Sequence, residues 1–121
     1  MGYFVDLLAY QKALELAMVI FQTSKRFPKE ETFSLTDQIR RSSRSVCANI
    51  AEGYRKRQYP KLFLLKLADS DGENSETEVW LQFAFRCSYL TKEEFEILSS
   101  RNLEVGKLLG HMIRNPEKYC K

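Results

Sequence analysis

The chain has 121 residues, of which 44% are hydrophobic and 29% are charged, so it can bury a sizeable core and is not a disordered protein. Five glycines and three prolines leave room for long helices and argue against a β-fold with many turns. The net charge of +3 is too small to identify a partner by itself, so the distribution of charge along the chain matters more.

The first predicted helix covers residues 5–26. One apolar stripe at helical spacing consists of Leu7, Tyr10, Leu14, Ala17, Met18 and Phe21. Leu8, Leu16 and Ile20 widen this stripe, so the helix must bury more than one side, either in its own core or against another subunit. Phe27-Pro28 ends the helix, because the residue before a proline is pushed out of helical geometry.

The second predicted helix covers residues 34–57, with Ser34 as N-cap and Asp37 as the acidic residue in the first turn. Its buried face is predicted to consist of Leu35, Ile39, Ser42, Ser43, Val46, Ile50 and Gly53. Small residues at 42 and 43 would allow a neighbouring helix to approach closely. The arginines at 40, 41, 44 and 55 fall on the other side of the helix.

The third and fourth predicted helices cover residues 59–89 and 92–115. The third contains a ten-residue polar stretch, Asp69–Glu78, which we predict to be a helical surface segment because long loops are uncommon in the middle of a chain of this size. The fourth opens with a capping box at Thr91 and Glu94 and ends at Asn115-Pro116. Four amphipathic helices with short connections predict an all-α, up-and-down antiparallel four-helix bundle as a single domain over residues 1–121.

The cysteines and the apolar runs predict a cytoplasmic protein without a membrane segment. Cys47, Cys87 and Cys120 lack the number and spacing of a disulfide framework or a metal clip. The apolar run Ala13–Phe21 contains Glu15, and no small-residue cleavage site follows it.

Charge is segregated between two adjacent parts of the chain. From Arg40 to Lys66 there are eight basic residues and one acidic residue, Glu52, whereas Asp69–Glu78 holds five acidic residues and no basic one. One interpretation is that the two blocks pair with each other, within the bundle or between subunits. The other is that the arginines bind phosphates, with Tyr54, Tyr59 and Phe63 placed to stack on unpaired bases.

Candidate catalytic groups are few, and we predict no enzyme, no metal and no cofactor. His111 is the only histidine and lies next to a core position of the last helix, where such a residue is usually structural. Cys47 and Cys87 are expected beside packing positions, where a thiol behaves as a small hydrophobic group. The carboxylates Glu73 and Glu76 lack the Glu-x-x-His element of metal sites in helical bundles.

The stretch from Gln38 to Gly53, QIRRSSRSVCANIAEG, resembles the signature of the bacterial four-helix bundle proteins encoded by intervening sequences in large-subunit rRNA genes. The segments QKA at residues 11–13, FPKEE at 27–31 and ETEVWL at 76–81 also match this pattern, so the resemblance covers nearly the whole chain. The sequence departs from it at Cys47, where a proline or small residue is common, and in the more acidic segment 69–72.

This resemblance implies a homopentameric barrel and no catalytic residues. The accessory variability determinant of diversity-generating retroelements is similar in fold, which implies binding of nucleic acid and of a reverse transcriptase or another protein partner. The motif positions with a structural interpretation are Gln38, Asn49, Glu52 and Gly53. We expect the Asn49 amide to bond a neighbouring helix, Glu52 to pair with Arg55 or Lys56, and Gly53 to mark a helix end or close packing.

The sequence therefore favours a non-enzymatic homo-oligomer that binds RNA or DNA. The predicted nucleic-acid-binding residues are Arg40, Arg41, Arg44, Arg55, Lys56, Arg57 and Lys61. The alternative is a protein-interaction scaffold in which these residues pair with the acidic stretch Asp69–Glu78 of a neighbouring subunit.

Overall fold

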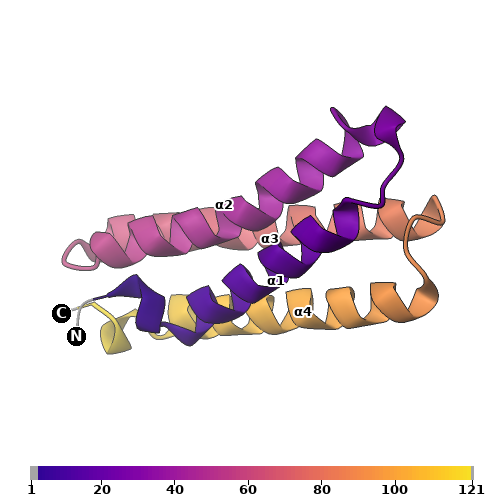
Figure 1. Cartoon of the computed structure of the whole chain (residues 1–121). Coiled ribbons are helices and arrows are strands. Elements are labelled where there is room, and N and C mark those ends of the chain that lie inside the picture. Colours follow the sequence, from indigo (N-terminus) through magenta and orange to yellow (C-terminus); the bar gives the residue numbers. More distant parts are fainter. Residues whose placement is uncertain (1–2, 121) are drawn as a thin grey trace.

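A computed structural model describes residues 3–120 of the chain. Four long helices dominate them: α1 (Leu8–Ser24), α2 (Leu35–Arg55), α3 (Pro60–Arg86) and α4 (Lys92–Arg114). Each helix packs against two others: α1 and α3 each contact both α2 and α4. Helices in contact run antiparallel (Figure 1). This arrangement confirms the all-α four-helix bundle. Three short 3-10 helices complete the described elements: η1 (Phe4–Asp6), η2 (Lys29–Glu31) and η3 (Pro116–Lys118).

The core-facing side of α1 differs from the predicted stripe. Its buried residues are Ala9, Ala13, Leu16, Ala17, Ile20 and Ser24. Leu14 and Met18 of the predicted stripe are instead 44% and 52% exposed. Burial is confirmed for Ala17 and for the widening residues Leu16 and Ile20. The stripe was wrong at Leu14 and Met18, because apolar residues surround most of this helix and periodicity alone could not choose the side that faces α2 and α4.

Helix α2 packs closely on α3 through small and polar residues, as the sequence predicted. The hydroxyl groups of Ser42 and Thr77 are hydrogen-bonded 2.8 Å apart, and Ser70 donates to the Val46 carbonyl over 2.8 Å. A Cβ on Gly53 would lie only 3.1 Å from the Cβ of Lys66. Gly53 therefore serves close packing inside the helix, which continues to Arg55.

The polar stretch of α3 is helical, but it is not wholly a surface segment. Three of its residues, Ser70, Asn74 and Thr77, are buried at helical spacing. Asn74 donates from Nδ2 to the Asn102 carbonyl of α4 over 3.2 Å, and Asn102 donates back to the Asn74 carbonyl over 3.0 Å. The buried side of this stretch, joined to α2 and α4 by hydrogen bonds, explains why it does not open into a loop.

The helix starts differ in how they are capped. Thr91 and Glu94 form the predicted capping box of α4. Ser34 stands at the N-cap of α2, but its side chain does not cap; it donates to the Glu31 carboxylate, which also accepts the Leu35 N–H. The Tyr89 hydroxyl donates to the same carboxylate over 2.8 Å, which raises the pKa of Tyr89 to about 12. Glu31 therefore caps α2 and links the segment before α2 to Tyr89 in the turn between α3 and α4.

Within residues 3–120, none of the helices combines the length and the apolar character needed to cross a bilayer.

Candidate nucleic-acid interface

The seven predicted binding residues form two groups on α2 and the turn that follows it. Arg40, Arg41 and Arg44 lie in the N-terminal half of the helix. The second group starts eleven residues after Arg44, a rise of about 16 Å along the helix axis. It consists of Arg55, Lys56, Arg57 and Lys61. The structure thus divides the predicted basic patch in two.

In the first group, Arg40 is already engaged with the end of α1. Its Nε donates to the Ser24 hydroxyl over 2.8 Å, and its Nη2 donates to the Phe21 carbonyl at the limit of 3.5 Å. The guanidinium groups of Arg40 and Arg44 lie 4.8 and 5.5 Å from the centre of the Phe21 ring. A cation is favourable here because unpaired carbonyls give a helix C-terminus a partial negative charge. Arg40 therefore has a structural role within the chain.

A polar groove of about 510 Å³ runs beside the same three arginines. It is lined by Thr32, Thr36, Asp37, Arg40, Arg41, Arg44, Ser45 and Ala48. Asp37 is the only acidic group in this lining, and it forms no ion pair with the described residues. Arg41 is exposed and makes a long 3.5 Å bond to the Gln38 side chain, so its charge faces solvent.

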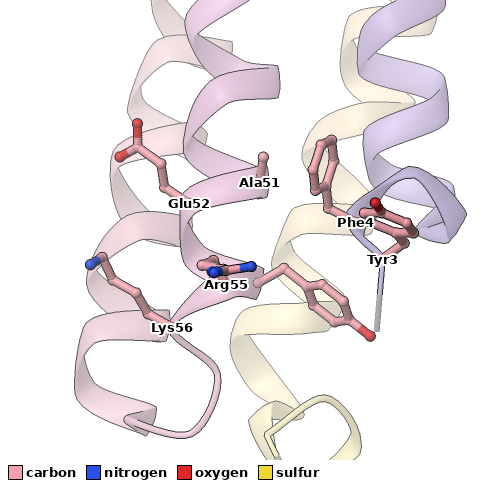
Figure 2. Close-up of a pocket in the computed structure, with 7 residues that line it drawn as sticks. Tyr3, Phe4, Ala51, Glu52, Arg55 and Lys56 are labelled. Atoms are coloured by element: carbon pink, nitrogen blue, oxygen red, sulfur yellow. The ribbon is translucent and has the colours of Figure 1, made fainter. Parts of the chain in front are cut away.

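In the second group, Arg55, Lys56 and Lys61 are exposed. Arg57 is more constrained, since its Nη1 donates to the Tyr54 carbonyl over 2.9 Å and its guanidinium lies 4.2 Å from the Tyr54 ring centre. Beside this group, between α2 and η1, is a hollow of about 330 Å³ (Figure 2). We call it the η1 hollow; its lining residues are Tyr3, Phe4, Ala51, Glu52, Tyr54, Arg55 and Lys56.

None of the seven basic residues has a carboxylate partner within the described part of the chain. The ion pairs found there are Arg26–Glu94, Lys66–Glu52 and Lys92–Glu96. The carboxylates of the acidic stretch also form no ion pair among residues 3–120. Glu76 accepts a hydrogen bond from the Trp80 ring, and Glu78 accepts from Gln82 and Ser99. The seven basic residues and the acidic stretch therefore both lack ion-pair partners among residues 3–120.

Two of the motif residues behave differently from the sequence-based expectation. The Asn49 amide donates to the carbonyl and hydroxyl of Ser45, one turn earlier, and does not reach a neighbouring helix. Glu52 pairs with Lys66 of α3 over 2.9 Å, not with Arg55 or Lys56. The half-buried Gln38 side chain accepts the long 3.5 Å bond from Arg41 of the same helix. The Glu52–Lys66 pair depends on how α2 and α3 are rotated relative to each other, which intrahelical spacing does not determine.

The aromatic residues near the basic groups are unequally accessible. Phe63 is 0% exposed and packs on Tyr119, so the hypothesis that it stacks on bases is wrong. Tyr59 is 56% exposed, and Tyr54 is half-buried. Sequence reasoning missed Tyr3 and Phe4, which line the η1 hollow. The adjacent aromatic pair just before the first helix was the available signal.

The candidate catalytic groups do not converge. Among residues 3–120, no three His, Cys, Asp or Glu side chains come together as a metal site. His111 is exposed, and its Nδ1 lies 3.5 Å from the Tyr119 hydroxyl. Cys47 is buried, which raises the pKa of its thiol to about 11, as expected for a packing residue. Cys87, expected beside the core, is exposed at the end of α3.

Comparisons with known proteins identify the family. The family model described as "23S rRNA-intervening sequence protein" matches residues 5–111. The chain belongs to this family. The chain is similar to a protein of unknown function from the S23 ribosomal protein family of Bacteroides thetaiotaomicron, known from a crystal structure. The two sequences are 34% identical, and the two structures superpose with a TM-score of 0.81. The similarity covers 88% of this chain and 96% of that one. No curated protein matches this member of the 23S rRNA-intervening sequence protein family.

Proposed function

We propose that this chain is a non-enzymatic, oligomeric protein that binds RNA or DNA through the two basic groups of α2 and the following turn. The observation that carries the proposal is the absence of any ion pair at all seven basic residues within residues 3–120. A positive surface left uncompensated by its own chain attracts a polyanion, and binding releases condensed counterions. Five of the seven are arginines, whose planar guanidinium matches phosphate geometry.

The two groups contribute unequally in this proposal. Arg55, Lys56 and Lys61 are exposed and can reach phosphates without losing an existing bond. Arg40 would have to leave Ser24 and Phe21, so we assign it to holding α1 against α2. The second group therefore supplies most of the affinity, and Arg41 and Arg44 extend the contact along the groove.

The test is a salt titration of binding to labelled RNA and DNA, single-stranded and double-stranded, by fluorescence anisotropy. We expect the logarithm of the binding constant to fall linearly with the logarithm of salt concentration. The double variant Arg55→Ala, Lys56→Ala should lower the slope by roughly 0.9 per lost duplex contact, or about 0.7 for a single strand.

The matched control is Arg101→Ala, Lys107→Ala, which removes the same charge from exposed positions of α4. It should bind almost as the wild type does. Equal losses in both double variants would mean that only net charge matters, and the assignment of the second basic group would be wrong. Absence of binding at low salt would contradict the proposed function itself.

Oligomerisation is part of the proposal and is supported by the outer side of α1. Leu14 and Met18 lie one helical turn apart and are 44% and 52% exposed, and Leu8 at the start of the helix is 53% exposed. Exposed apolar side chains that lie side by side are typical of interfaces. Light scattering on the samples used for binding measures the mass. A pentamer, implied by the resemblance, would have five times the chain mass of 14.2 kDa.

A second candidate function is a protein-interaction scaffold, favoured by the acidic stretch that also lacks ion pairs within the described chain. In this case Arg44 and its neighbours pair with Asp69–Glu78 of an adjacent subunit. Arg44→Glu should then change the oligomer mass, and adding Glu73→Arg or Glu76→Arg should restore it. An unchanged oligomer mass in Arg44→Glu would exclude this pairing. The arginines would then be available to bind a partner from outside the oligomer.

A further inference from the structure

The η1 hollow brings aromatic rings next to the more exposed basic group. Residue Tyr3 and η1 lie alongside α2, and Figure 2 shows Tyr3 and Phe4 on one side of the opening with Ala51 and Arg55 on the side of α2 that faces them. The lining is mostly apolar, and its volume of about 330 Å³ is at the small end of the range for ligand sites. A flat group with few polar atoms fits such a space.

The aromatic wall is partly fixed and partly open. The Phe4 ring packs edge-on against Tyr10, with ring centres 4.9 Å apart, so its orientation is held by α1. Tyr3 packs edge-on against Phe4 at 6.3 Å and remains 67% exposed. The Tyr54 ring already carries the Arg57 guanidinium at 4.2 Å. Tyr3 therefore offers the most accessible ring surface in the lining.

The charges around the hollow favour an anionic ligand. Glu52 is the only acidic residue in the lining, and its carboxylate is paired with Lys66 of α3. In Figure 2, Glu52 and Lys56 point to the opposite side of α2 from Tyr3 and Phe4, whereas Arg55 lies toward them. Arg55 has no carboxylate partner among residues 3–120. The hollow thus combines apolar walls with an unpaired guanidinium at its edge.

We propose that the η1 hollow takes one unpaired base of a single-stranded nucleic acid, stacked on Tyr3, while Arg55 binds an adjacent phosphate. This inference rests on the proposed function and narrows its ligand to a strand with at least one unstacked base. Aromatic rings stack on any base through its π-face, and an arginine beside them holds the backbone. A fully paired duplex exposes no base to enter the hollow, so it would bind through phosphates alone.

The experiment compares a single-stranded RNA dodecamer with an abasic strand of the same length and charge, at one salt concentration. The wild-type protein should bind the base-containing strand about tenfold more tightly, the equivalent of one stacked base. Tyr3→Ala should remove most of this difference while leaving the affinity for the abasic strand and the salt slope unchanged. Ala51→Leu, which fills the hollow without altering charge, should also reduce the preference for the base-containing strand.

Tyr59→Ala is the matched control. Tyr59 is similarly exposed and lies near Arg57 and Lys61 of the second basic group, but it does not line the hollow. It should keep the tenfold preference. An equal loss in Tyr59→Ala would mean that exposed aromatic surface in general, not the hollow, carries the preference, and would overturn the inference. Circular dichroism melting of each variant confirms that it is folded at the assay temperature.

The remaining outcomes separate this inference from the proposed function. Equal binding of both strands with a steep salt dependence would overturn the base site and leave the polyanion surface standing. Absence of binding to either strand at low salt would overturn both proposals. If the preference for the base-containing strand survived both Tyr3→Ala and Ala51→Leu, the stacking site would lie elsewhere. The assignment of the base site to the η1 hollow would then be wrong.

Discussion

The two faces of α2 differ in what fixes their side chains. On the buried face, Ile50 is 0% exposed, and Gly53 lies so close to α3 that even one added carbon would contact Lys66. On the outer face, Arg55 and Lys56 are exposed and have no ion-pair partner within the described residues. Close packing therefore fixes the side chains of the first face, whereas no ion pair among residues 3–120 fixes Arg55 and Lys56 on the second. Substitutions on one face should therefore change folding, and those on the other should change binding.

The largest expected effect is on the buried face. Ile50→Ala removes a fully buried side chain and should lower the free energy of unfolding by about 2–5 kcal/mol, because a cavity remains in the core. Urea denaturation at a fixed protein concentration measures this loss. Below the melting temperature of the variant, RNA binding should match the wild type. A change in the salt slope would show that the two faces are coupled.

The next effect concerns how closely α2 and α3 approach. Gly53→Leu should cost about 1–3 kcal/mol of unfolding free energy, because the added side chain meets Lys66, Leu67 and the Phe63 carbonyl. Gly72→Leu is the matched control, because nothing lies within 4 Å of a Cβ at that position. It should stabilise the helix by about 0.5–1 kcal/mol. Equal effects of the two substitutions would contradict close packing at Gly53.

Two arginines of the outer side sharpen the comparison. Arg40→Ala removes the hydrogen bond to Ser24 and the contact with Phe21, and should cost about 1 kcal/mol of stability. Arg55→Ala should change the free energy of unfolding by no more than about 0.5 kcal/mol, as substitutions at exposed sites usually do. We expect the reverse order for affinity toward RNA. If Arg40→Ala weakened binding more than Arg55→Ala, the first group would be the main contact.

The smallest effect is pH-dependent and lies at the start of α2. Hydrogen bonds from Ser34, Tyr89 and the Leu35 N–H lower the pKa of Glu31 below its ordinary value of 4.5. A lowered folded-state pKa gives a contribution that is present above the ordinary value and lost as pH falls through the lowered one. Glu31→Gln should thus reduce the melting temperature by a few degrees at most at pH 7, and by less at pH 3. An equal reduction at both pH values would exclude a charge effect.

Much of the fold followed from local patterns in the sequence. Periodic apolar residues and the Thr91–Glu94 capping box defined the helices, because helix formation and capping depend on residues within one or two turns. The buried face of α2 was predictable because charged residues occupy its other side. The basic and acidic blocks were also visible in the sequence, since they are runs along the chain.

Only the tertiary structure determined which side chains contact each other across helices. It selected Ala9 and Ala13 over Leu14 and Met18 as the core side of α1, a helix that is apolar on most sides. It joined Arg40 to Ser24 and Glu52 to Lys66, and it placed Tyr3 and Phe4 beside Arg55. Such contacts depend on the rotation and register of whole helices. Packing of the complete core sets both, and local spacing does not.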